Sequence, residues 1–189
     1  SSKSPSSRGP VTCSSLRKGV HKVAIKPGWE GRFLEDFEVG DIYRSAIGRT
    51  ITEFDNINFT LLTNNDNQIH FNSEYAKGTQ WGKPLVNSVF TIAVITGLAV
   101  KDVSQNGFAL GWDKIVLPTP VFAGDTLYAE TEVLAVRESQ SDPTRGIVNV
   151  RTRGVKQDGT IILVFERPVM VWKRMHAPAI GVFPEIKET

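Results

Sequence analysis

The segment 63–71, with the sequence TNNDNQIHF, carries the side chains of this chain that are best suited to acid–base chemistry. Four consecutive amide or acid side chains, a further amide and His70 fall within nine positions. Imidazole exchanges protons near neutral pH, while amides and carboxylates can hold water or a polar substrate. The pattern therefore predicts a site centred on His70. A histidine that only satisfies hydrogen bonds in the core is the alternative interpretation.

The positions of histidine and cysteine do not favour a metal site. The single cysteine is Cys13, and the three histidines, His21, His70 and His176, lie far apart and lack a spacing such as HExxH. One cysteine also excludes an intramolecular disulfide and suits a reducing compartment. We therefore predict a site that uses no metal.

The charge distribution argues against nucleic acid as a partner. The formal net charge is +2, but residues 1–29 hold six basic side chains and no acidic one, so that the remainder is net −4. A nucleic-acid-binding domain normally presents a basic face, which residues 30–189 lack in their composition.

The 189 residues, 40% hydrophobic and 22% charged, are typical of one globular domain with extensions. We predict a basic, serine-rich N-terminal extension over 1–29, a domain over 30–176 and a C-terminal tail over 177–189. The extension has the composition of a transit peptide, and an arm packed on a partner is the alternative. We expect a cytoplasmic protein, or one of the mitochondrial matrix if the extension is a transit peptide.

Two short helices should flank the histidine segment. Thr52 and Asp55 resemble a capping box, and apolar residues follow at helical spacing, which predicts a helix over 53–63. A strand is expected before it, over 42–51. A second helix is expected over 73–78, with Asn72 or Ser73 as its cap and Gly78 at its end. The histidine segment should therefore lie in the polar turn between the two helices.

A third helix is expected within 86–100, where apolar side chains occupy every face, so we predict that it is buried on all sides. It is too short, and too interrupted by Thr and Gly97, to span a membrane. Asn87 or Ser88 should cap it.

Four strands are expected after this helix, over 108–117, 125–139, 146–155 and 160–174. Alternation of polar and apolar residues over 148–153 has the period of a half-buried strand, and Asp158-Gly159 predicts a tight hairpin. An antiparallel sheet wrapped around one long apolar helix is the α+β layout of a hot-dog fold. Such folds pair edge to edge, which predicts a homodimer.

The chain resembles the MaoC-like dehydratase family, which includes (R)-specific enoyl-CoA hydratases, in the order ITEFDNINFTLLTNNDNQIHFNSEYAKGTQWGKPLVNSVFT followed by PVFAGDTLYAETEVLAVRES. The resemblance covers nearly all of residues 31–174. It implies a hydro-lyase that adds or removes water across the double bond of an enoyl-CoA thioester. It also implies a homodimer or higher homo-oligomer, no membrane and no cofactor, with CoA as part of the substrate.

The family pattern places an Asp five positions before the catalytic His, with an Asn between them. Aligned on His70, the Asn position is Asn67 and the Asp position is Asn65, which is a departure from the pattern. Three interpretations stay open. His70 is the principal acid–base group and Asn65 orients water, Asp66 supplies the carboxylate in a shifted register, or the site binds acyl-CoA without catalysis.

A second departure lies at the start of the core helix, where the family has His-Gly and this chain has Asn87-Ser88. The resemblance implies that the Ser88 N–H could stabilise the thioester oxygen as enolate charge develops. Plain helix capping by these two residues is the alternative.

With both departures the chain resembles branches of the family that act on methyl-branched or dicarboxylic acyl-CoAs, of the mesaconyl-CoA, itaconyl-CoA or beta-methylmalyl-CoA type. The candidate substrate-binding residues are Arg49, Asn64, Asn67, Asn87 and Trp112, together with Asn65. The candidates for the CoA phosphates are Lys83, Lys114, Arg137 and Arg145.

Two other functions remain as alternatives, because one hot-dog scaffold hosts several. A thioesterase would need a carboxylate that activates water, for which Asp66 and Glu74 are the candidates. A non-catalytic acyl-CoA-binding subunit would need neither of these carboxylates.

Overall fold

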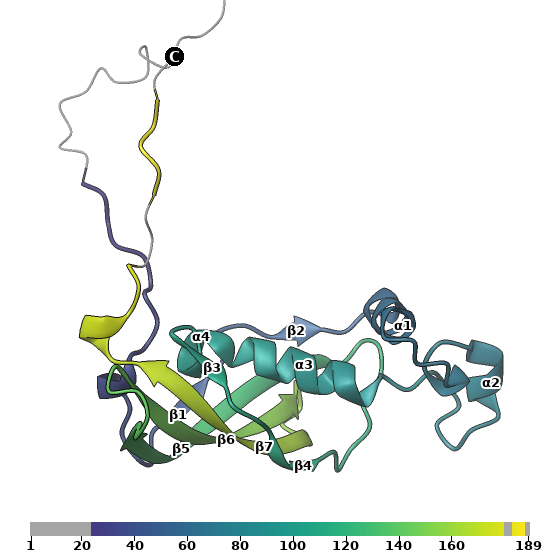
Figure 1. Ribbon diagram of the computed structural model, residues 1–189. Coiled ribbons are helices and arrows are strands. Elements are labelled where there is room, and N and C mark those ends of the chain that lie inside the picture. Colours follow the sequence, from purple (N-terminus) through teal and green to yellow (C-terminus); the bar gives the residue numbers. More distant parts are fainter. Residues whose placement is uncertain (1–23, 180–182, 188–189) are drawn as a thin grey trace, which may run out of the picture.

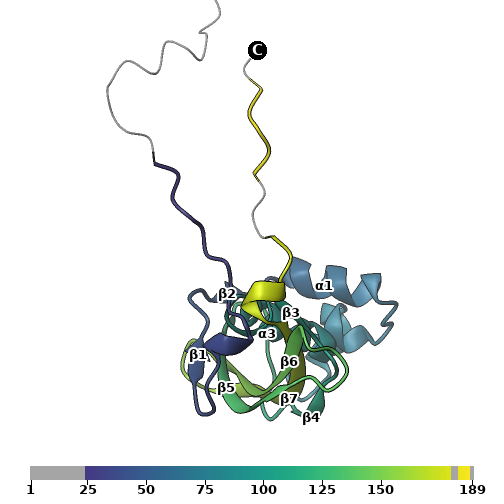
Figure 2. The same ribbon diagram turned by 60° about the vertical axis from the view of Figure 1, so that its left-hand side comes forward.

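The computed structural model describes residues 24–179 and 183–187, and its elements are drawn in Figure 1. Most of the predicted N-terminal extension and part of the predicted C-terminal tail lie outside these residues. The two ends of the described chain run in the same direction away from the folded body (Figure 2). Within the described residues, no helix is both long and apolar enough to cross a bilayer.

The body is a seven-stranded antiparallel sheet in the order β1-β5-β6-β7-β3, with β2 also on β5 and β4 also on β7. The strands are β1 (Ile42–Arg44), β2 (Arg49–Thr50), β3 (Gly107–Ala109), β4 (Asp113–Val116), β5 (Thr126–Glu138), β6 (Arg145–Lys156) and β7 (Ile161–Trp172). The three long strands match the predicted ones, and the β6–β7 hairpin turns at Gly159, whose φ of 84° suits glycine.

Helices lie on the concave face of the sheet and beyond one end of it (Figure 1). The α-helices are α1 (Glu53–Leu62), α2 (Ser73–Lys77), α3 (Ser88–Leu98) and α4 (Val100–Val103). The 3-10 helices are η2 (Leu34–Asp36), η3 (Gln68–His70) and η4 (Arg174–His176). Helix α3 rests on the sheet, whereas α1 and α2 project past its end, so the predicted hot-dog layout is confirmed.

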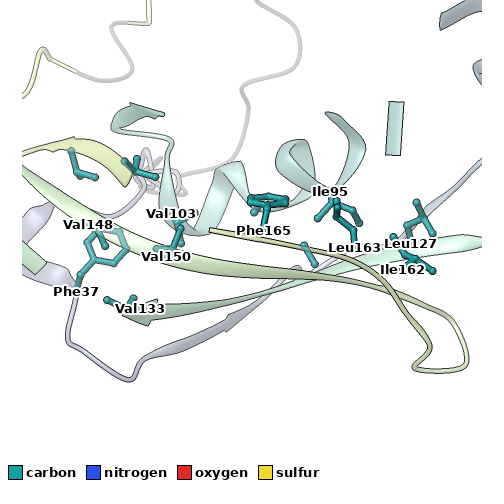
Figure 3. Packing of buried hydrophobic residues seen from close by; sticks show 14 of the residues in the cluster. Phe37, Ile95, Val103, Leu127, Val133, Val148, Val150, Ile162, Leu163 and Phe165 are labelled. Carbon is teal, nitrogen blue, oxygen red and sulfur yellow. The ribbon is translucent and has the colours of Figure 1, made fainter. Parts of the chain in front are cut away.

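The core lies between α3 and the long strands, where Ile95, Leu127 and Phe165 are fully buried (Figure 3). Gly154 on β6 permits this close packing. A Cβ atom there would lie 2.7 Å from the side chain of Ile95 and 2.9 Å from that of Ile162. The helix therefore approaches the sheet most closely where β6 has no side chain.

The prediction that the core helix is buried on all sides is wrong for the single chain. Thr91 and Ile95 are buried, but Val89 is 60% exposed and Ala93 and Gly97 also face outward. One sheet covers only one side of a helix, so apolar residues on the other side of α3 have no cover among the described residues. The helix itself runs over Ser88–Leu98, within the predicted range 86–100.

Two predicted strands are each divided in the structure. The segment 42–51 forms β1 and β2, with a bend at residues 46–47 between them. Gly48 follows the bend and packs closely on Tyr128, since a Cβ at Gly48 would lie 2.5 Å from that ring. The segment 108–117 forms β3 and β4, with a register shift and a left-handed Lys114 at φ 51°. Both breaks depend on neighbouring strands, which local alternation does not encode.

Candidate active site

Helix α1, which directly follows β2, is the first element of the site along the chain. The Asp55 N–H donates to the Thr52 hydroxyl at 3.1 Å, and the Asp55 carboxylate accepts the Thr52 N–H at 2.9 Å, so the predicted capping box is present. The Thr52 hydroxyl also donates to the Asp55 carboxylate at 2.7 Å. The two hydrogen bonds that the carboxylate accepts from Thr52, together with the Arg49 guanidinium 2.7 Å away, lower the pKa of Asp55. Arg49, a predicted substrate ligand, is therefore engaged with Asp55. It lines a separate cavity, between the β1–β2 loop and α3.

The amides after α1 shape the loop that carries the histidine. Asn64 takes a left-handed conformation with φ 54°. The Asn65 side-chain oxygen accepts the Asn67 N–H at 3.0 Å, and the Asn67 side-chain oxygen accepts the Ile69 N–H at 3.3 Å and caps η3. Both bonds are local turns of the kind that Asn side chains make. They leave the Nδ2 groups of Asn65 and Asn67 outside the hydrogen bonds of the described residues.

His70 ends η3, and its side chain is held in one orientation. The residue is 8% exposed, and its Nδ1 atom lies 2.8 Å from the carbonyl oxygen of Leu85. A carbonyl oxygen only accepts, so Nδ1 carries the proton in this bond. In the neutral ring Nε2 then holds the free lone pair. His70 can take a proton at Nε2 and return it.

A cavity of about 90 Å³ lies beside His70. Its polar lining comprises Glu53, Asn56, His70, Ser73 and Lys83. A liquid water occupies about 30 Å³, so a few waters or a small polar group fit. Glu53 and Asn56 had not been singled out from the sequence, where only the apolar spacing of 53–63 was used. The carboxylate candidate Asp66 does not line this cavity, nor does the thioesterase candidate Glu74, which pairs with Lys77.

The N-terminus of α3 lies next to this histidine. The Asn87 side-chain oxygen accepts the Val89 N–H at 2.9 Å, and its Nδ2 donates to the Thr60 hydroxyl at 3.3 Å. The Asn87 side chain is buried, and its polar atoms are bonded to the start of α3 and to Thr60, so it caps the helix as the alternative interpretation expected. Ser88 is exposed and lines a second cavity, of about 360 Å³, which Leu85 also lines. Leu85 thus has two contacts: its carbonyl accepts the hydrogen bond from His70, and the residue lines this second cavity.

Both ends of the segment that carries the site are tied to a single turn. The Gly124 N–H donates to the Ile51 carbonyl at 2.8 Å, just before α1. The Val86 N–H donates to the Val121 carbonyl at 2.9 Å, just before α3. The chain therefore leaves the sheet after β2 and returns to it at the same place, the turn 121–124.

Trp112 is half-exposed between β3 and β4, at the edge of the sheet beside β7. Among the described residues it lines neither the His70 cavity nor the Ser88 cavity. Its role as a substrate ligand therefore stays a prediction.

Of the four cations considered for CoA phosphates, Lys83 lines the His70 cavity, with its ammonium 4.3 Å from the centre of the Phe122 ring. The other three are placed elsewhere. Lys114 pairs with Glu166 at 2.7 Å, Arg145 stacks on Trp172 at 3.7 Å, and Arg137 is exposed near the end of β5.

A hot-dog sheet with a histidine loop at the start of the central helix defines the chain as a MaoC-like hot-dog protein. Residues 20–183 match the family model of mesaconyl-CoA hydratase, so the chain belongs to that family.

Named relatives agree with this assignment. The mesaconyl-CoA hydratase of Cereibacter sphaeroides is 34% identical over 145 residues, which are 76% of this chain and 42% of the relative. The beta-methylmalyl-CoA dehydratase of Chloroflexus aurantiacus is 32% identical and is matched over 79% of this chain and 43% of the relative. The crystal structure of a MaoC domain protein dehydratase from Chloroflexus aurantiacus has a TM-score of 0.75 at 30% identity, over 86% of this chain and 47% of that one. This chain spans less than half the length of these proteins.

Proposed function

We propose that this chain catalyses reversible hydration of an enoyl-CoA thioester of the mesaconyl-CoA type. The observation that carries the proposal is the hydrogen bond from His70 Nδ1 to the Leu85 carbonyl, three residues before α3, which leaves Nε2 as a proton acceptor. The family match and the names of the relatives support the same reaction.

Hydration places a hydroxyl on the β-carbon and a proton on the α-carbon. His70 Nε2 takes the proton from water as the water oxygen bonds to the β-carbon, and electron density moves to the thioester oxygen. The exposed N–H groups at the start of α3, that of Ser88 among them, stabilise this developing enolate oxygen. The enolate then collapses as the α-carbon takes up a proton. The proposed reaction needs no metal or cofactor.

The second acid–base group is open to assignment, because Asn65 cannot act as a base. We assign it to Glu53, the carboxylate that lines the same cavity as His70. Asn65 does not line this cavity among the described residues, so its role of orienting water through Nδ2 stays a prediction. Asp66 is exposed and lies outside the lining of that cavity.

A mesaconyl thioester is a methyl-branched dicarboxylic acid with one carboxylate left free. Lys83 is the cation that lines the His70 cavity, so it suits this carboxylate or a CoA phosphate at the mouth of the site. Asn64 and Asn67 of the histidine loop are exposed and do not line this cavity, so their role as substrate ligands stays a prediction.

A second copy of the chain is proposed as the partner at the β3–β4 edge. This edge exposes large apolar side chains, namely Phe108, Leu110, Trp112, Ile115, Val116 and Leu117. An exposed apolar edge strand is a template for further pairing. The relatives are more than twice the length of the matched region and so have room for a second unit of this size.

The test measures mesaconyl-CoA and other short or branched enoyl-CoAs by mass spectrometry, for a gain of one water. We expect hydration that falls by about 10²- to 10⁴-fold in His70→Ala and is unchanged in His176→Ala, since His176 is exposed in η4. Unchanged turnover in His70→Ala would overturn the proposal. Release of free thiol would point to a thioesterase, and CoA binding without turnover to a non-catalytic subunit.

A further inference from the structure

Asn56 on α1 is a buried amide that joins three parts of the site. The residue is 3% exposed. Its Nδ2 group donates to the His70 carbonyl at 2.7 Å and to the Leu85 carbonyl at 3.1 Å, and its Oδ1 accepts the Asn87 N–H at 2.8 Å. All the side-chain polar atoms of Asn56 are therefore used, on the histidine loop, on the residues before α3 and on the cap of α3.

The Leu85 carbonyl is the acceptor that Asn56 and His70 share. It receives Asn56 Nδ2 at 3.1 Å and His70 Nδ1 at 2.8 Å, and a carbonyl oxygen has two lone pairs. With Asn56 bound to one lone pair, the direction of the carbonyl is set and the other is aimed at the imidazole. The protonation state of the ring nitrogens is governed by such a bond at the far nitrogen.

The third contact of Asn56, with the Asn87 N–H, links the histidine loop to helix α3, whose N-terminus would bind the oxyanion. The Asn87 N–H that bonds to Asn56 belongs to the cap of α3, and the same Asn56 holds the carbonyl of His70. One side chain thus fixes the spacing between the His70 backbone and the start of α3.

We propose that Asn56 is a positioning residue that keeps His70 in the Nδ1–H tautomer and sets the distance from its ring to the N-terminus of α3. An amide is required, because two carbonyls need donors and one N–H needs an acceptor. Aspartate keeps the acceptor but presents a second oxygen to the two carbonyls, and leucine offers neither group. The kinetic consequence rests on the proposed hydratase function, whereas the tautomer does not.

The main variant is Asn56→Asp, which preserves size and the bond to the Asn87 N–H. Its matched control is Asn58→Asp, because Asn58 is exposed on the same helix. The first measurement is ¹⁵N NMR of histidine-labelled protein, above the pH at which the ring titrates. The His70 signal is identified by its loss in His70→Ala. Wild type and Asn58→Asp should show a protonated Nδ1 and an unprotonated Nε2, and Asn56→Asp should move toward the other tautomer.

The second measurement separates kcat from KM on the hydrated enoyl-CoA. Asn56→Asp should lower kcat by about 10- to 100-fold, in the range for groups that orient a reacting side chain, with KM changed by less than about threefold. Asn58→Asp should leave both unchanged. A purely structural role for Asn56 would lower the amount of folded protein without changing the tautomer of the molecules that fold.

The proposal is overturned if folded Asn56→Asp, checked by circular dichroism, keeps the wild-type His70 tautomer. If wild type hydrates no enoyl-CoA, the proposed function fails, yet the NMR measurement still decides the role of Asn56. If Asn56→Asp does not fold, Asn56→Ser takes its place. It keeps one hydroxyl donor, and it should show a partial tautomer shift, whose absence would also overturn the proposal.

Discussion

The Nδ1 atom of His70 donates a hydrogen bond to the main-chain carbonyl of Leu85, 15 residues further along the chain, at 2.8 Å. The partner of the imidazole is therefore a carbonyl and not a carboxylate. A carbonyl orients the ring and selects its tautomer without adding a full negative charge beside it. The second acid–base group has to come from another side chain of the cavity.

Asn65→Asp tests the departure from the family pattern. The new carboxylate can still accept the Asn67 N–H that Asn65 accepts at 3.0 Å, so the loop should keep its shape. We expect hydration of crotonyl-CoA to rise by about tenfold or more, because a base is then available next to the histidine loop. Loss of mesaconyl-CoA hydration with no gain on crotonyl-CoA would instead mean that the amide itself is needed.

Glu53→Gln and Asp66→Asn separate the two existing carboxylates. Both residues are exposed, but Glu53 lines the cavity beside His70 and Asp66 does not. Glu53→Gln should lower kcat by about 10²-fold or more, and Asp66→Asn should change it by less than about twofold. Steady-state kinetics of both variants on one substrate provide the comparison. The reverse order of effects would assign the carboxylate to Asp66.

Asp55→Ala should weaken the start of α1, and the effect should depend on pH. Loss of the capping box costs about 1 kcal/mol of unfolding free energy at neutral pH. The pKa of Asp55 is lowered in the folded state, first by its bonds to Thr52 and then by Arg49. A lowered pKa adds stability that is complete above the ordinary carboxyl pKa and is lost as the pH falls through the folded-state value. Urea unfolding at pH 7 and near pH 3 should therefore show a smaller difference at acid pH.

Arg167→Met should stabilise the chain. Arg167 on β7 is 2% exposed, and its Nε and Nη2 atoms have no hydrogen-bond partner among the described residues. Burial lowers the pKa of its guanidinium to about 10, so it stays charged near neutral pH at a cost in free energy. An apolar side chain of similar size should raise the unfolding free energy by about 1–4 kcal/mol.

The control for Arg167 is Arg153→Met, which removes an ion pair with Glu130 on the outer face of the sheet and should change stability little. Thermal unfolding of both variants gives the answer. A large drop in the Tm of Arg167→Met would mean that an acceptor outside the described residues binds this guanidinium.

Ile115→Lys should disrupt the proposed pairing at the β3–β4 edge. Ile115 is 42% exposed on β4, and a lysine on an edge strand opposes pairing with a second strand. Ile161→Lys is the matched control, because Ile161 is 41% exposed at the start of β7. Light scattering after size-exclusion chromatography should give a dimer for wild type and Ile161→Lys, and a monomer for Ile115→Lys. A wild-type monomer would contradict the proposed pairing.

Local patterns in the sequence were enough to predict the long strands, the β6–β7 turn, α1 with its cap and α2. Each depends on residues that are close in the chain, such as Thr52 with Asp55. The position of His70 was predicted by its neighbours and by the family resemblance. The break between β1 and β2 was missed, because contacts such as that of Gly48 with Tyr128 on β5, 80 positions away in the numbering, leave no local pattern.

The same reasoning explains what was missed in the site. Asn56 lies at an interior position of α1, where an amide has no local signature, and its three partners come from later segments. Asn87 and Arg49 were assigned to a substrate from their types alone. In the structure the Asn87 side chain caps α3, and the Arg49 guanidinium forms an ion pair with Asp55. Only tertiary contacts distinguish a free polar group from one that is already bonded.

The turn 121–124 receives both ends of the segment that carries α1, the histidine loop and α2, through Gly124 to Ile51 and Val121 to Val86. Because both ends of this segment are held at one turn, the segment can be joined to another hot-dog sheet with little change in the distance between its two ends. Residues 52–86 therefore form a segment that can be exchanged as a unit, here called the cassette. We expect that exchange of this cassette between hot-dog proteins alters the chemistry while leaving the sheet intact. Such a graft would need to carry the pairing of Asn56 with the cap of α3, since that contact extends beyond the cassette to Asn87.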